Sequence, residues 1–362
     1  MRDLHLKQDF YRNKKVLITG HTGFKGAWLT LWLTMLGAKV TGVALEPEPG
    51  CLFEQLGGFN NITNIYCDIR NLEALTKIIK TAEPDIIIHL AAFSFLKEAH
   101  KDPVRTFTTN LQGGVNLLEA VRQNQGVSAI VLVTTDKVYN NKGLERGYTE
   151  ADELGGGLEV YSGSKACLEI AVESYRNAYF QPEKYAEHRS AIATARASNV
   201  LGGGDHINSR IVPSILNSLS LNENIVIRNP NAIRPWQNIL DALSGYLTLA
   251  QNLYTYGPEF SGAWNFGPFF SGIQTVEKLV QGFIKSWGGE ASYSVTNNIT
   301  VREAGVLKLD ITKSMDKLGW KPIRNLQQTI DETVEFYKNS IKDENIKTLC
   351  QKQIENYMKD LF

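Results

Sequence analysis

Two short stretches of this chain carry side chains that suit acid–base chemistry. The apolar run Val131-Leu-Val ends abruptly in Thr134-Thr-Asp-Lys137, which supplies two hydroxyls, an acid and a base. Further along, Tyr161 and Lys165 stand at i, i+4 spacing, so on a helix they share one face. Open α/β sheets build their sites where buried strands deliver polar groups at their carboxyl ends. The two stretches are therefore predicted to form one site.

The chemistry predicted for these residues is proton transfer coupled to hydride transfer. A lysine ammonium near Tyr161 would lower the tyrosine pKa by favouring the phenolate. The phenolate could then take a proton from a sugar hydroxyl near neutral pH. Thr135 is placed to hydrogen-bond the same hydroxyl. The catalytic candidates are Thr135, Asp136, Lys137, Tyr161 and Lys165.

Composition bounds the class of protein. The 362 residues suffice for one large domain or two, and the 43% hydrophobic and 21% charged residues are ordinary for a globular protein. The 38 basic and 38 acidic residues cancel, which argues against nucleic-acid or membrane-surface binding. The four cysteines form no C-x-x-C motif and the six histidines show no ligand spacing, so no metal site is predicted. Without a signal peptide or a membrane span, a reduced, cytoplasmic protein is expected.

A cofactor site is predicted near the N-terminus. The strand Lys15–Thr19 leads into Gly20-His-Thr-Gly-Phe-Lys-Gly26, which is followed by a helical pattern to Leu36 and a second strand over Val40–Leu45. Glycines at the first turn of such a βαβ unit let a pyrophosphate approach the helix N-terminus, whose N–H groups can bind it. The candidate residues of this turn are Gly20, Thr22, Gly23, Phe24, Lys25 and Gly26.

The second strand leaves the type of dinucleotide open. An acid at its end usually binds the adenosine ribose, but the chain there reads Ala44-Leu-Glu-Pro, so Glu46 comes late. Lys25 or Arg70 could meet a ribose phosphate instead. NAD and NADP therefore both remain compatible with this position.

Strand and helix patterns alternate over roughly 200 residues, which is typical of a doubly wound parallel (Rossmann-type) sheet. Asp68 follows the third strand and either caps the next helix or binds adenine, whereas Asn110 either joins a hydrogen-bond network below the cofactor or faces solvent. The further expected strands are 62–66 with 68–70, 85–92, 127–135 and 190–196, and the helices 72–81, 106–123 and 161–179. The remaining cofactor-binding candidates are Asp68, Ile69, Leu90, Ala91, Ala92 and Asn110, together with Tyr161 and Lys165.

After residue 200 the segments become shorter and richer in Asn and Pro. Helices are expected over 211–221 and 240–254, short strands over 263–267 and 292–295, and an amphipathic helix in the tail from residue 343. We interpret residues 1–200 as the dinucleotide-binding domain with the catalytic Tyr and Lys. Residues 201–362 are interpreted mainly as a smaller α/β region for the substrate.

The chain resembles the extended short-chain dehydrogenase/reductases that act on nucleotide sugars, from about Lys15 to Tyr337. Within them it is most similar to the CDP-glucose 4,6-dehydratase family. The motifs that carry the resemblance include Gly20–Gly26 with Trp28, Thr134–Lys137 with Tyr139-Asn-Asn141, Tyr161-Ser-Gly-Ser-Lys165, Ala195–Val200 with Gly202–Asp205, Arg234-Pro-Trp-Gln237, Leu307–Asp310 and Leu318-Gly-Trp320.

The resemblance implies a lyase that uses NAD and ends with a 4-keto-6-deoxy sugar for deoxysugar biosynthesis, as in lipopolysaccharide. Tyr161 would deprotonate the C4 hydroxyl during oxidation, and Asp136 would protonate the departing C6 hydroxyl. Most 4,6-dehydratases place Glu beside that Asp as the base at C5, whereas this chain has Lys137, as CDP-glucose dehydratases do. A lysine serves as base only where burial or neighbouring cations favour its amine, so Lys137 either takes part in elimination or orients other groups.

The resemblance also suggests the substrate and the assembly. Guanidinium groups suit bidentate phosphate contact, and the candidates for the substrate are Asn199, Arg210, Arg234 and Arg302. Ser94 and Lys97 are added because Ala91-Ala-Phe-Ser-Phe-Leu-Lys97 departs from the family's usual pattern beside the sugar. The resemblance favours CDP-D-glucose as the substrate. The departure beside the sugar leaves another nucleotide sugar possible as the substrate. A homodimer or homotetramer is implied by the resemblance alone.

Two other functions remain open from the sequence. A 4-epimerase of the same fold needs no acid and base aimed at C5 and C6. A non-catalytic dinucleotide or nucleotide-sugar sensor would not need Tyr161, Lys165 and Asp136 together.

Overall fold

The structure is a computed structural model that describes residues 2–157, 159–207, 209–288, 290–296, 306–342 and 344–362. Its strands are β1 (Lys15–Thr19), β2 (Lys39–Ala44), β3 (Thr63–Tyr66), β4 (Ile86–His89), β5 (Ala129–Thr135), β6 (Ala191–Ala197), β7 (Asn199–Leu201), β8 (Ile225–Ile227), β9 (Ile233–Asn238), β10 (Gly262–Phe266), β11 (Ile273–Thr275) and β12 (Tyr293–Val295).

The α-helices are α1 (Phe24–Met35), α2 (Leu52–Gln55), α3 (Leu72–Ala82), α4 (Leu96–Lys101), α5 (Pro103–Phe107), α6 (Gly113–Gln123), α7 (Val160–Tyr179), α8 (Tyr185–His188), α9 (Ile211–Ser220), α10 (Ile239–Tyr256), α11 (Val276–Trp287), α12 (Thr312–Leu318), α13 (Leu326–Ile341) and α14 (Ile346–Leu361). The tighter or wider helical turns are η1 (Thr108–Gln112), η2 (Asp136–Val138), η3 (Pro182–Lys184), η4 (Gly257–Phe260) and η5 (Phe270–Gly272).

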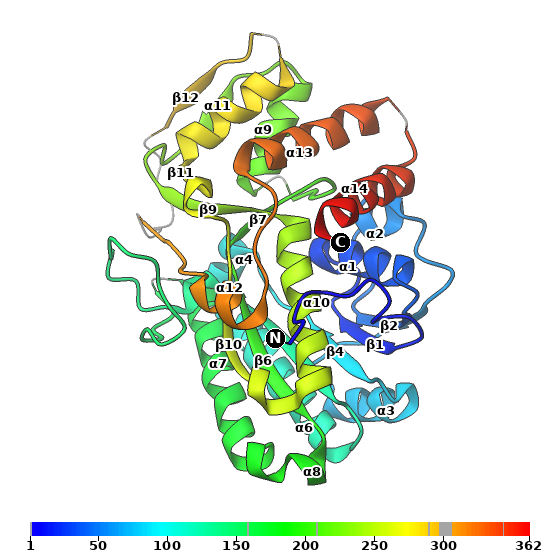
Figure 1. Cartoon of the computed structure of the whole chain (residues 1–362). Coiled ribbons are helices and arrows are strands. Elements are labelled where there is room, and N and C mark those ends of the chain that lie inside the picture. Colours follow the sequence, from blue (N-terminus) through cyan, green and yellow to red (C-terminus); the bar gives the residue numbers. More distant parts are fainter. Residues whose placement is uncertain (1, 158, 208, 289, 297–305, 343) are drawn as a thin grey trace.

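The described residues form a seven-stranded sheet in the order β10-β6-β5-β4-β1-β2-β3. All of its pairings are parallel. Helices α1, α10 and α14 cover one face and α3, α6 and α7 the other (Figure 1). The predicted doubly wound parallel sheet is therefore confirmed. Strand order reverses between β1 and β4, the place where ligands bind in such sheets.

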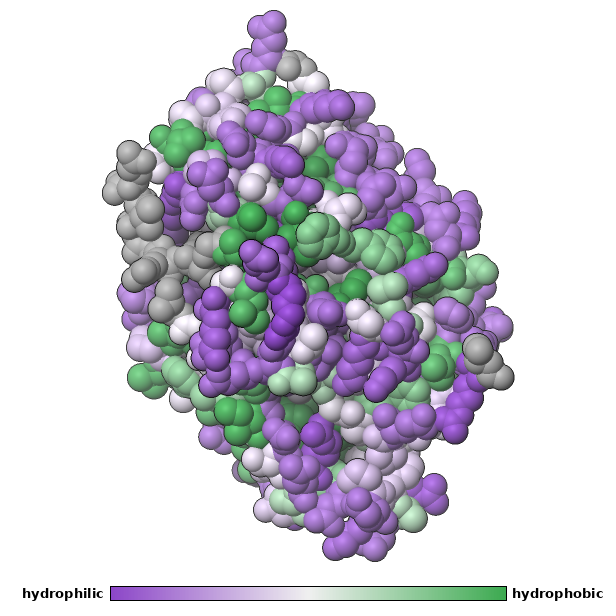
Figure 2. All heavy atoms as spheres, turned by 60° about the vertical axis from the view of Figure 1, so that its left-hand side comes forward, coloured by the Kyte–Doolittle hydropathy of each residue, from purple (hydrophilic) through white to green (hydrophobic). Residues whose placement is uncertain are grey.

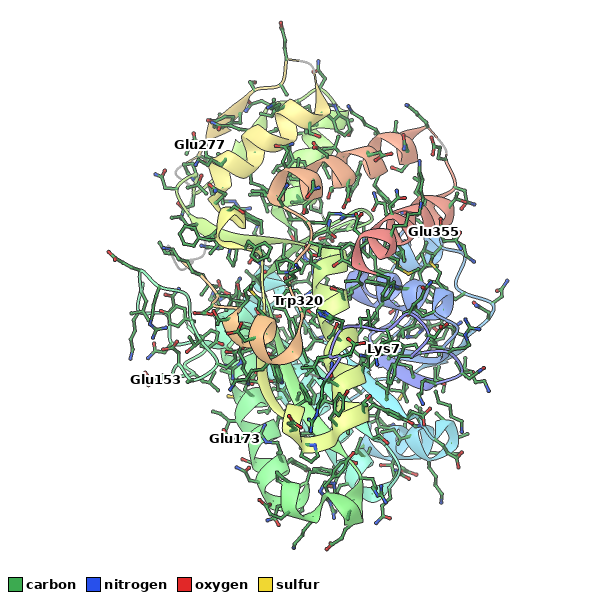
Figure 3. All side chains as sticks on the ribbon, viewed as in Figure 1. Lys7, Glu153, Glu173, Glu277, Trp320 and Glu355 are labelled. Carbon is green, nitrogen blue, oxygen red and sulfur yellow. The ribbon has the colours of Figure 1, made fainter. Side chains whose placement is uncertain are left out.

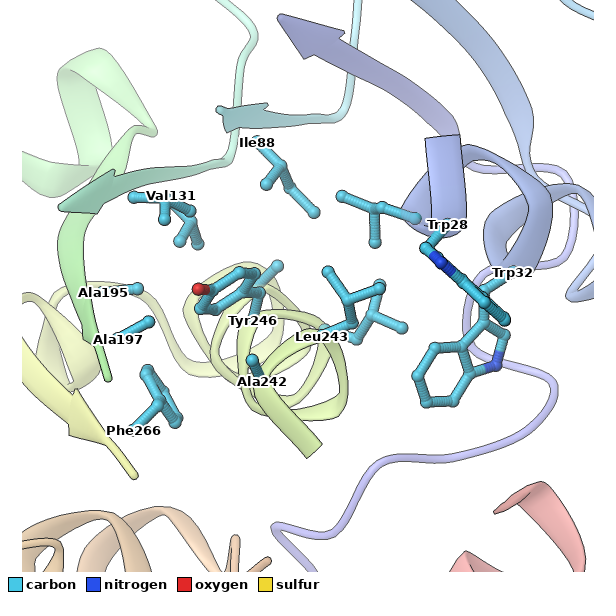
Figure 4. Packing of buried hydrophobic residues seen from close by; sticks show 14 of the residues in the cluster. Trp28, Trp32, Ile88, Val131, Ala195, Ala197, Ala242, Leu243, Tyr246 and Phe266 are labelled. Carbon is cyan, nitrogen blue, oxygen red and sulfur yellow. The ribbon is translucent and has the colours of Figure 1, made fainter. Parts of the chain in front are cut away.

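The central strands are buried on both faces, and β4 shows how their side chains divide. Ile86 and Ile88 join the hydrophobic cluster under α1 and α10, whereas Ile87 joins the cluster under α3 and α6. This alternation follows from the two-residue period of a strand. On the first face Tyr246 of α10 packs beneath the strands that carry Ile88 and Val131 (Figure 4).

The C-terminal part of the chain builds a smaller layer beside the sheet. It contains a three-stranded sheet (β11-β9-β7), a two-stranded sheet (β12-β8) and a third hydrophobic cluster that includes residues of α9, α11 and α13. The strand expected over 263–267 does not belong to this smaller layer. It forms β10 and pairs with β6 as the edge strand of the main sheet. The chain after residue 200 thus also supplies α10 and β10 to the main sheet.

The helix expected over 106–123 is interrupted. The chain forms α5, then the π-helical turn η1, then α6. Asn110 lies in that turn, fully buried, where its amide oxygen accepts from the Phe93 N–H at 2.7 Å and its amide nitrogen donates to the Phe93 carbonyl and the Ser164 hydroxyl. The wider turn therefore serves a side chain that binds two other segments, and solvent exposure of Asn110 is excluded.

Helix α14, the amphipathic tail, packs on α1 and is held by a buried polar cluster. Tyr357 donates to Asp241 at 2.7 Å, and Asp241 also accepts from the Ile323 N–H at 2.8 Å. Ser244 bonds both Tyr357 and Trp320, which lies beside α10 (Figure 3). Burial raises the pKa of Asp241 to about 7.

Hydrophilic residues cover most of the face seen in Figure 2, with hydrophobic residues among them in small separate groups. No helix within the described ranges combines the length and the apolar character needed to span a bilayer.

The raised pKa of Asp241 predicts a pH-dependent stability. Because the folded protein holds the proton more tightly than the unfolded chain, the stability contribution of Asp241 is full below pH 4 and is lost as the pH rises through 7. Asp241→Asn cannot titrate. We expect the free energy of unfolding of the wild type, relative to this variant, to fall by about 3 kcal/mol between pH 5 and pH 8 in urea titrations.

Asp316→Asn, at an exposed position of α12, is the control and should show the pH dependence of the wild type. Equal pH dependence in all three proteins would contradict the role of Asp241.

Candidate active site

One cavity of about 840 Å³ lies at the carboxyl ends of the central strands. This size is in the range of small-molecule and cofactor sites. Of the predicted site residues, it is lined by Gly20, Thr22, Gly23, Phe24, Lys25, Gly26, Asp68, Ile69, Leu90, Ala91, Ala92, Ser94, Lys97, Thr135, Asp136, Lys137, Tyr161, Lys165, Asn199, Arg210 and Arg234. Asn110 lies behind the wall, bonded to Phe93 and Ser164. Arg302 falls outside the described residues.

The turn between β1 and α1 can hold a phosphate group. Gly20 has a φ of 76°, and a Cβ there would come within 2.6 Å of the Ala91 nitrogen. A Cβ on Gly26 would overlap the Gly20 carbonyl oxygen, so both glycines are needed for packing. At Gly23 a Cβ would meet nothing closer than that oxygen, at 3.4 Å, and Gly23 borders the cavity. The helix N-terminus is therefore open to a ligand there.

The acid that follows β3 is not a helix cap. Asn71 caps α3 by accepting from the Ala74 N–H, whereas Asp68 accepts from Arg70, whose Nη2 lies 2.6 Å away. This pairing lowers the pKa of Asp68. The capping alternative for Asp68 is wrong, and its position on the cavity wall suits the adenosine end of a dinucleotide.

The two cations considered for a ribose phosphate are both engaged elsewhere. Arg70 binds Asp68, and Lys25 donates to the Tyr246 hydroxyl at 3.3 Å. Burial and the charge of Arg210 lower the pKa of Lys25 to about 8. Glu46 borders the cavity just after β2.

Asp136 has the properties of a general acid. It directly follows β5 and is almost completely buried. Its Oδ1 accepts from the Thr135 hydroxyl at 3.0 Å, while Oδ2 has no partner among the described residues. Burial raises the pKa of Asp136, against the opposing charges of Lys137 and Arg234. A carboxyl group that keeps its proton nearer to neutral pH can donate it to a leaving group.

Tyr161 and Lys165 lie one turn apart at the start of α7, as predicted. Lys165 donates to the Val133 carbonyl at 3.0 Å, and burial and the charge of Lys25 lower its pKa to about 8. The pKa of Tyr161 is raised to about 12 by burial and by the negative charge of Asp136. The prediction of a lowered tyrosine pKa is therefore wrong for the protein by itself, because desolvation outweighs the neighbouring cations.

Lys137 also follows β5 and is partly buried. Its Nζ lies 3.5 Å from Oε2 of Glu159, which immediately precedes α7. Lys137 thus has an acidic neighbour, Glu159, in addition to the burial and neighbouring cations that the sequence analysis considered.

The predicted substrate residues within the described ranges border the same cavity. Arg210 Nη1 donates to both carboxylate oxygens of Asp205, each at 3.0 Å. Its Nη2 donates to the Ser94 hydroxyl at 3.2 Å. Arg234 is buried on β9, and its charge acts on Asp136. Asn199 begins β7, next to β9. These residues converge from the smaller region and from the segment after β4.

Comparison with known proteins decides the family. Residues 16–263 match the model of the NAD dependent epimerase/dehydratase family. The chain belongs to this family. It is also 40% identical, over 98% of both chains, to a CDP-glucose 4,6-dehydratase of Salmonella typhimurium. The resemblance inferred from the motifs is confirmed by this relative.

Solved structures of the family share the fold. A dTDP-glucose 4,6-dehydratase from Bacillus anthracis, in complex with NAD, superposes with a TM-score of 0.75 at 21% identity, over 90% of this chain and 97% of the other. A UDP-glucose 4-epimerase from Stenotrophomonas maltophila, with bound NAD, gives 0.78 at 20% identity, over 92% and 100%. Dehydratases and epimerases thus fit the same backbone.

Sequence reasoning missed several residues that shape the site. Glu159 and Glu169 are not among the predicted residues, although Glu159 comes two residues before Tyr161 and Glu169 lies two turns after it on α7. Tyr246, whose hydroxyl accepts from Lys25, and Arg105 on α5, which borders the cavity, are likewise not predicted. Of these residues, only Glu169 could have been found from the sequence pattern, because it stands four residues after Lys165 and so shares its helix face. Within the described ranges, no three or more His, Cys, Asp or Glu side chains are grouped to hold a metal ion.

Two substitutions in the glycine turn should affect different properties, one the affinity for NAD and the other the stability of the fold. Gly23→Ala places a methyl in the open cavity, so we expect an unchanged melting temperature but at least a tenfold loss of NAD affinity, about 1.4 kcal/mol. Gly26→Ala places a methyl against the Gly20 carbonyl and should cost roughly 2 kcal/mol of stability or more. Thermal melts and calorimetric titration with NAD measure both effects. Wild-type affinity in Gly23→Ala would show that the ligand does not approach this turn.

Proposed function

We propose that this protein is an NAD-dependent 4,6-dehydratase of a nucleotide hexose that converts CDP-D-glucose to CDP-4-keto-6-deoxy-D-glucose and water. The observation that carries the proposal is the placement of Asp136 and Lys137 beside Tyr161 on one cavity wall, immediately after the strand-end Thr135. An epimerase, which oxidises and reduces only C4, has no use for an acid and a base at this point.

The cavity fits the dinucleotide. Gly20 and Gly26 keep side chains out of the turn, and Gly23 leaves the N-terminus of α1 open. Asp68 lines the cavity and would meet the adenosine end of the dinucleotide. The residues that would hold NAD are the turn Gly20–Gly26, Asp68, Ile69 and the segment Leu90–Ala92, with Asn110 bracing Phe93 beside them. When bound, NAD supplies a hydride acceptor and donor for the sugar carbons.

The residues of the chain handle the protons. Tyr161, as phenolate, takes the proton of the C4 hydroxyl, and Thr135 positions that hydroxyl. The resulting 4-ketone acidifies the C5 proton, which Lys137 removes, while Asp136 gives its proton to the C6 hydroxyl that leaves as water. The raised pKa of Asp136 suits a proton donor. Lys165, whose pKa is about 8, keeps a positive charge near Tyr161 at neutral pH.

The nucleotide is inferred from the relative and from the charges. The Salmonella typhimurium relative, similar over nearly the whole chain, is named as a CDP-glucose 4,6-dehydratase. Arg210, Arg228 and Arg234 border the cavity, where their guanidinium groups suit the pyrophosphate of the substrate. Within this proposal, residues 1–200 bind NAD and carry the catalysis, and residues 201–362 mainly bind the nucleotide sugar.

The cellular setting is part of the same proposal. We place the protein in the cytoplasm as a homodimer or homotetramer that supplies deoxysugars for surface polysaccharide such as lipopolysaccharide. Size-exclusion chromatography with light scattering tests the assembly.

The test of the function is a panel of CDP-glucose, dTDP-glucose and UDP-glucose, with the alkaline absorbance of a 4-keto product and NMR of the sugar as readouts. We expect CDP-glucose to give the keto product and to raise the melting temperature most. A C4 epimer without a keto product would overturn the dehydratase in favour of an epimerase. A keto product from another nucleotide would retain the reaction and change the substrate.

Asp136→Asn should separate oxidation from elimination. The amide cannot donate the proton to the C6 hydroxyl, so we expect dehydration to fall by about 10²-fold or more, while nucleotide-sugar binding persists. Single-turnover absorbance of the reduced nicotinamide reports the oxidation step. If oxidation and dehydration fell equally, Asp136 would not be the acid of the elimination step.

A further inference from the structure

Glu159 reaches Lys137 from a position that the Tyr161–Lys165 motif does not include. It is the N-cap residue of α7, with extended backbone, yet its side chain accepts from none of the helix N–H groups. Its Oε2 instead lies 3.5 Å from Lys137 Nζ and accepts from the Ser162 hydroxyl at 3.2 Å. The side chain is only 11% exposed. A buried carboxylate in this place is not explained by helix capping.

As the base at C5, Lys137 needs a group that can accept a proton from its ammonium, and the contact with Glu159 offers one. To remove the C5 proton, Lys137 must present a neutral amine. A fixed negative charge beside it favours the ammonium instead, which cannot accept a proton. The conflict disappears if the carboxylate takes the proton itself when a bound sugar shields the pair from water, because a neutral acid and a neutral amine then cost less than two charges removed from water.

We propose that Glu159 is a positioning residue that accepts a proton from Lys137 and so presents the amine of Lys137 to the sugar. The inference rests on the proposed dehydratase function and names a further residue that this function needs.

The proton balance of the step is complete. One proton moves from the Lys137 ammonium to the Glu159 carboxylate. The amine then takes the C5 proton as the C5–H bond breaks, a C5=C6 double bond forms, the C6–O bond breaks and Asp136 protonates the leaving oxygen. When the double bond is reduced, Lys137 returns a proton to C5 and retrieves its own from Glu159. The proton that Tyr161 took from the C4 hydroxyl replaces the one that Asp136 gave up.

A second, small cavity adjoins the pair. It measures about 30 Å³ and is lined by Lys137, Tyr139, Asn141, Gly157, Glu159, Ser162, Arg234 and Leu307. Lys137 and Arg234 also border the large cavity. Such a space, with polar groups around it, has room for a water molecule.

The other charged groups around the pair fit this role. Asp136 and Tyr161 face it from the substrate side, Arg234 from β9, and Tyr139 from the segment after η2. Burial is the main cause of the raised pKa of Tyr161, and the negative charge of Glu159 adds to it. Burial also raises the pKa of Asp136, and the charge of Arg234 opposes that rise. The charge of Glu159 therefore reaches Tyr161 as well as Lys137.

The test compares Glu159→Gln and Glu159→Asp with Glu173→Gln, an exposed glutamate of the same helix (Figure 3). In deuterated water we measure deuterium incorporation at C5, the pH profile of kcat and the KM for CDP-glucose. Glu159→Gln cannot take the proton, so C5 exchange should fall by about 10²-fold at neutral pH and recover as the pH rises. Glu159→Asp should restore part of the rate, and Glu173→Gln should behave as wild type.

The Lys137→Ala background completes the test. If Glu159 acts through Lys137, adding Glu159→Gln to Lys137→Ala should cause no further loss. Wild-type C5 exchange in Glu159→Gln, or an unshifted pH profile, would overturn the proposal. So would an equal loss of C4 oxidation, which would place the effect at Tyr161 or in the fold. If the wild type forms no 4-keto product from any nucleotide hexose, the proposed function itself fails, and the inference falls with it.

Discussion

The buried ion pair between Glu169 and Arg196 is the constraint on which the geometry of the site depends. Both side chains are at most 5% exposed. Glu169 accepts from Nε and Nη2 of Arg196 and from the hydroxyls of Thr134 and Thr194, so its acceptors are satisfied. Buried pairs seldom add net stability, since desolvation offsets their attraction, but they fix one arrangement. Here they tie α7 to the ends of β5 and β6, and thereby hold Tyr161 against Asp136.

Desolvation is the common cause of the unusual proton affinities around the cavity. It lowers the pKa of Lys25 and Lys165 to about 8 and raises that of Tyr161 to about 12. An anionic ligand near the two lysines would favour their ammonium forms and so strengthen the positive field around the tyrosine. The binding of a charged ligand is therefore coupled to the protonation of Tyr161. The protein alone holds Tyr161 as a phenol, and the charge of a ligand would shift the equilibrium between phenol and phenolate.

The sequence predicts the main sheet well because its elements are long and strongly patterned. β1 and α7 agree with the predicted bounds to within one residue, and the candidate residues at the strand ends meet in one cavity. Where the predictions differ, tertiary contacts decide. The π-helical turn exists because Asn110 binds the Phe93 backbone, and the edge position of β10 depends on pairing with β6. The contact of Lys137 with Glu159 joins residues twenty-two apart, with no spacing rule to reveal it.

One backbone serves both epimerases and dehydratases. In the proposed function, the residues that separate the two reactions lie where the sheet ends. β5 is complete at Thr135, and η2 begins at the next residue, Asp136. The side chains of Asp136 and Lys137 therefore take no part in the pairing of β5 with its neighbours. Lys165 and the ion pair between Glu169 and Arg196 are held by contacts that involve neither of these two residues. Under the proposed function, a change at these two positions would alter which sugar carbon can exchange a proton while the strands stay paired, so their chemistry, rather than the architecture, would determine the reaction.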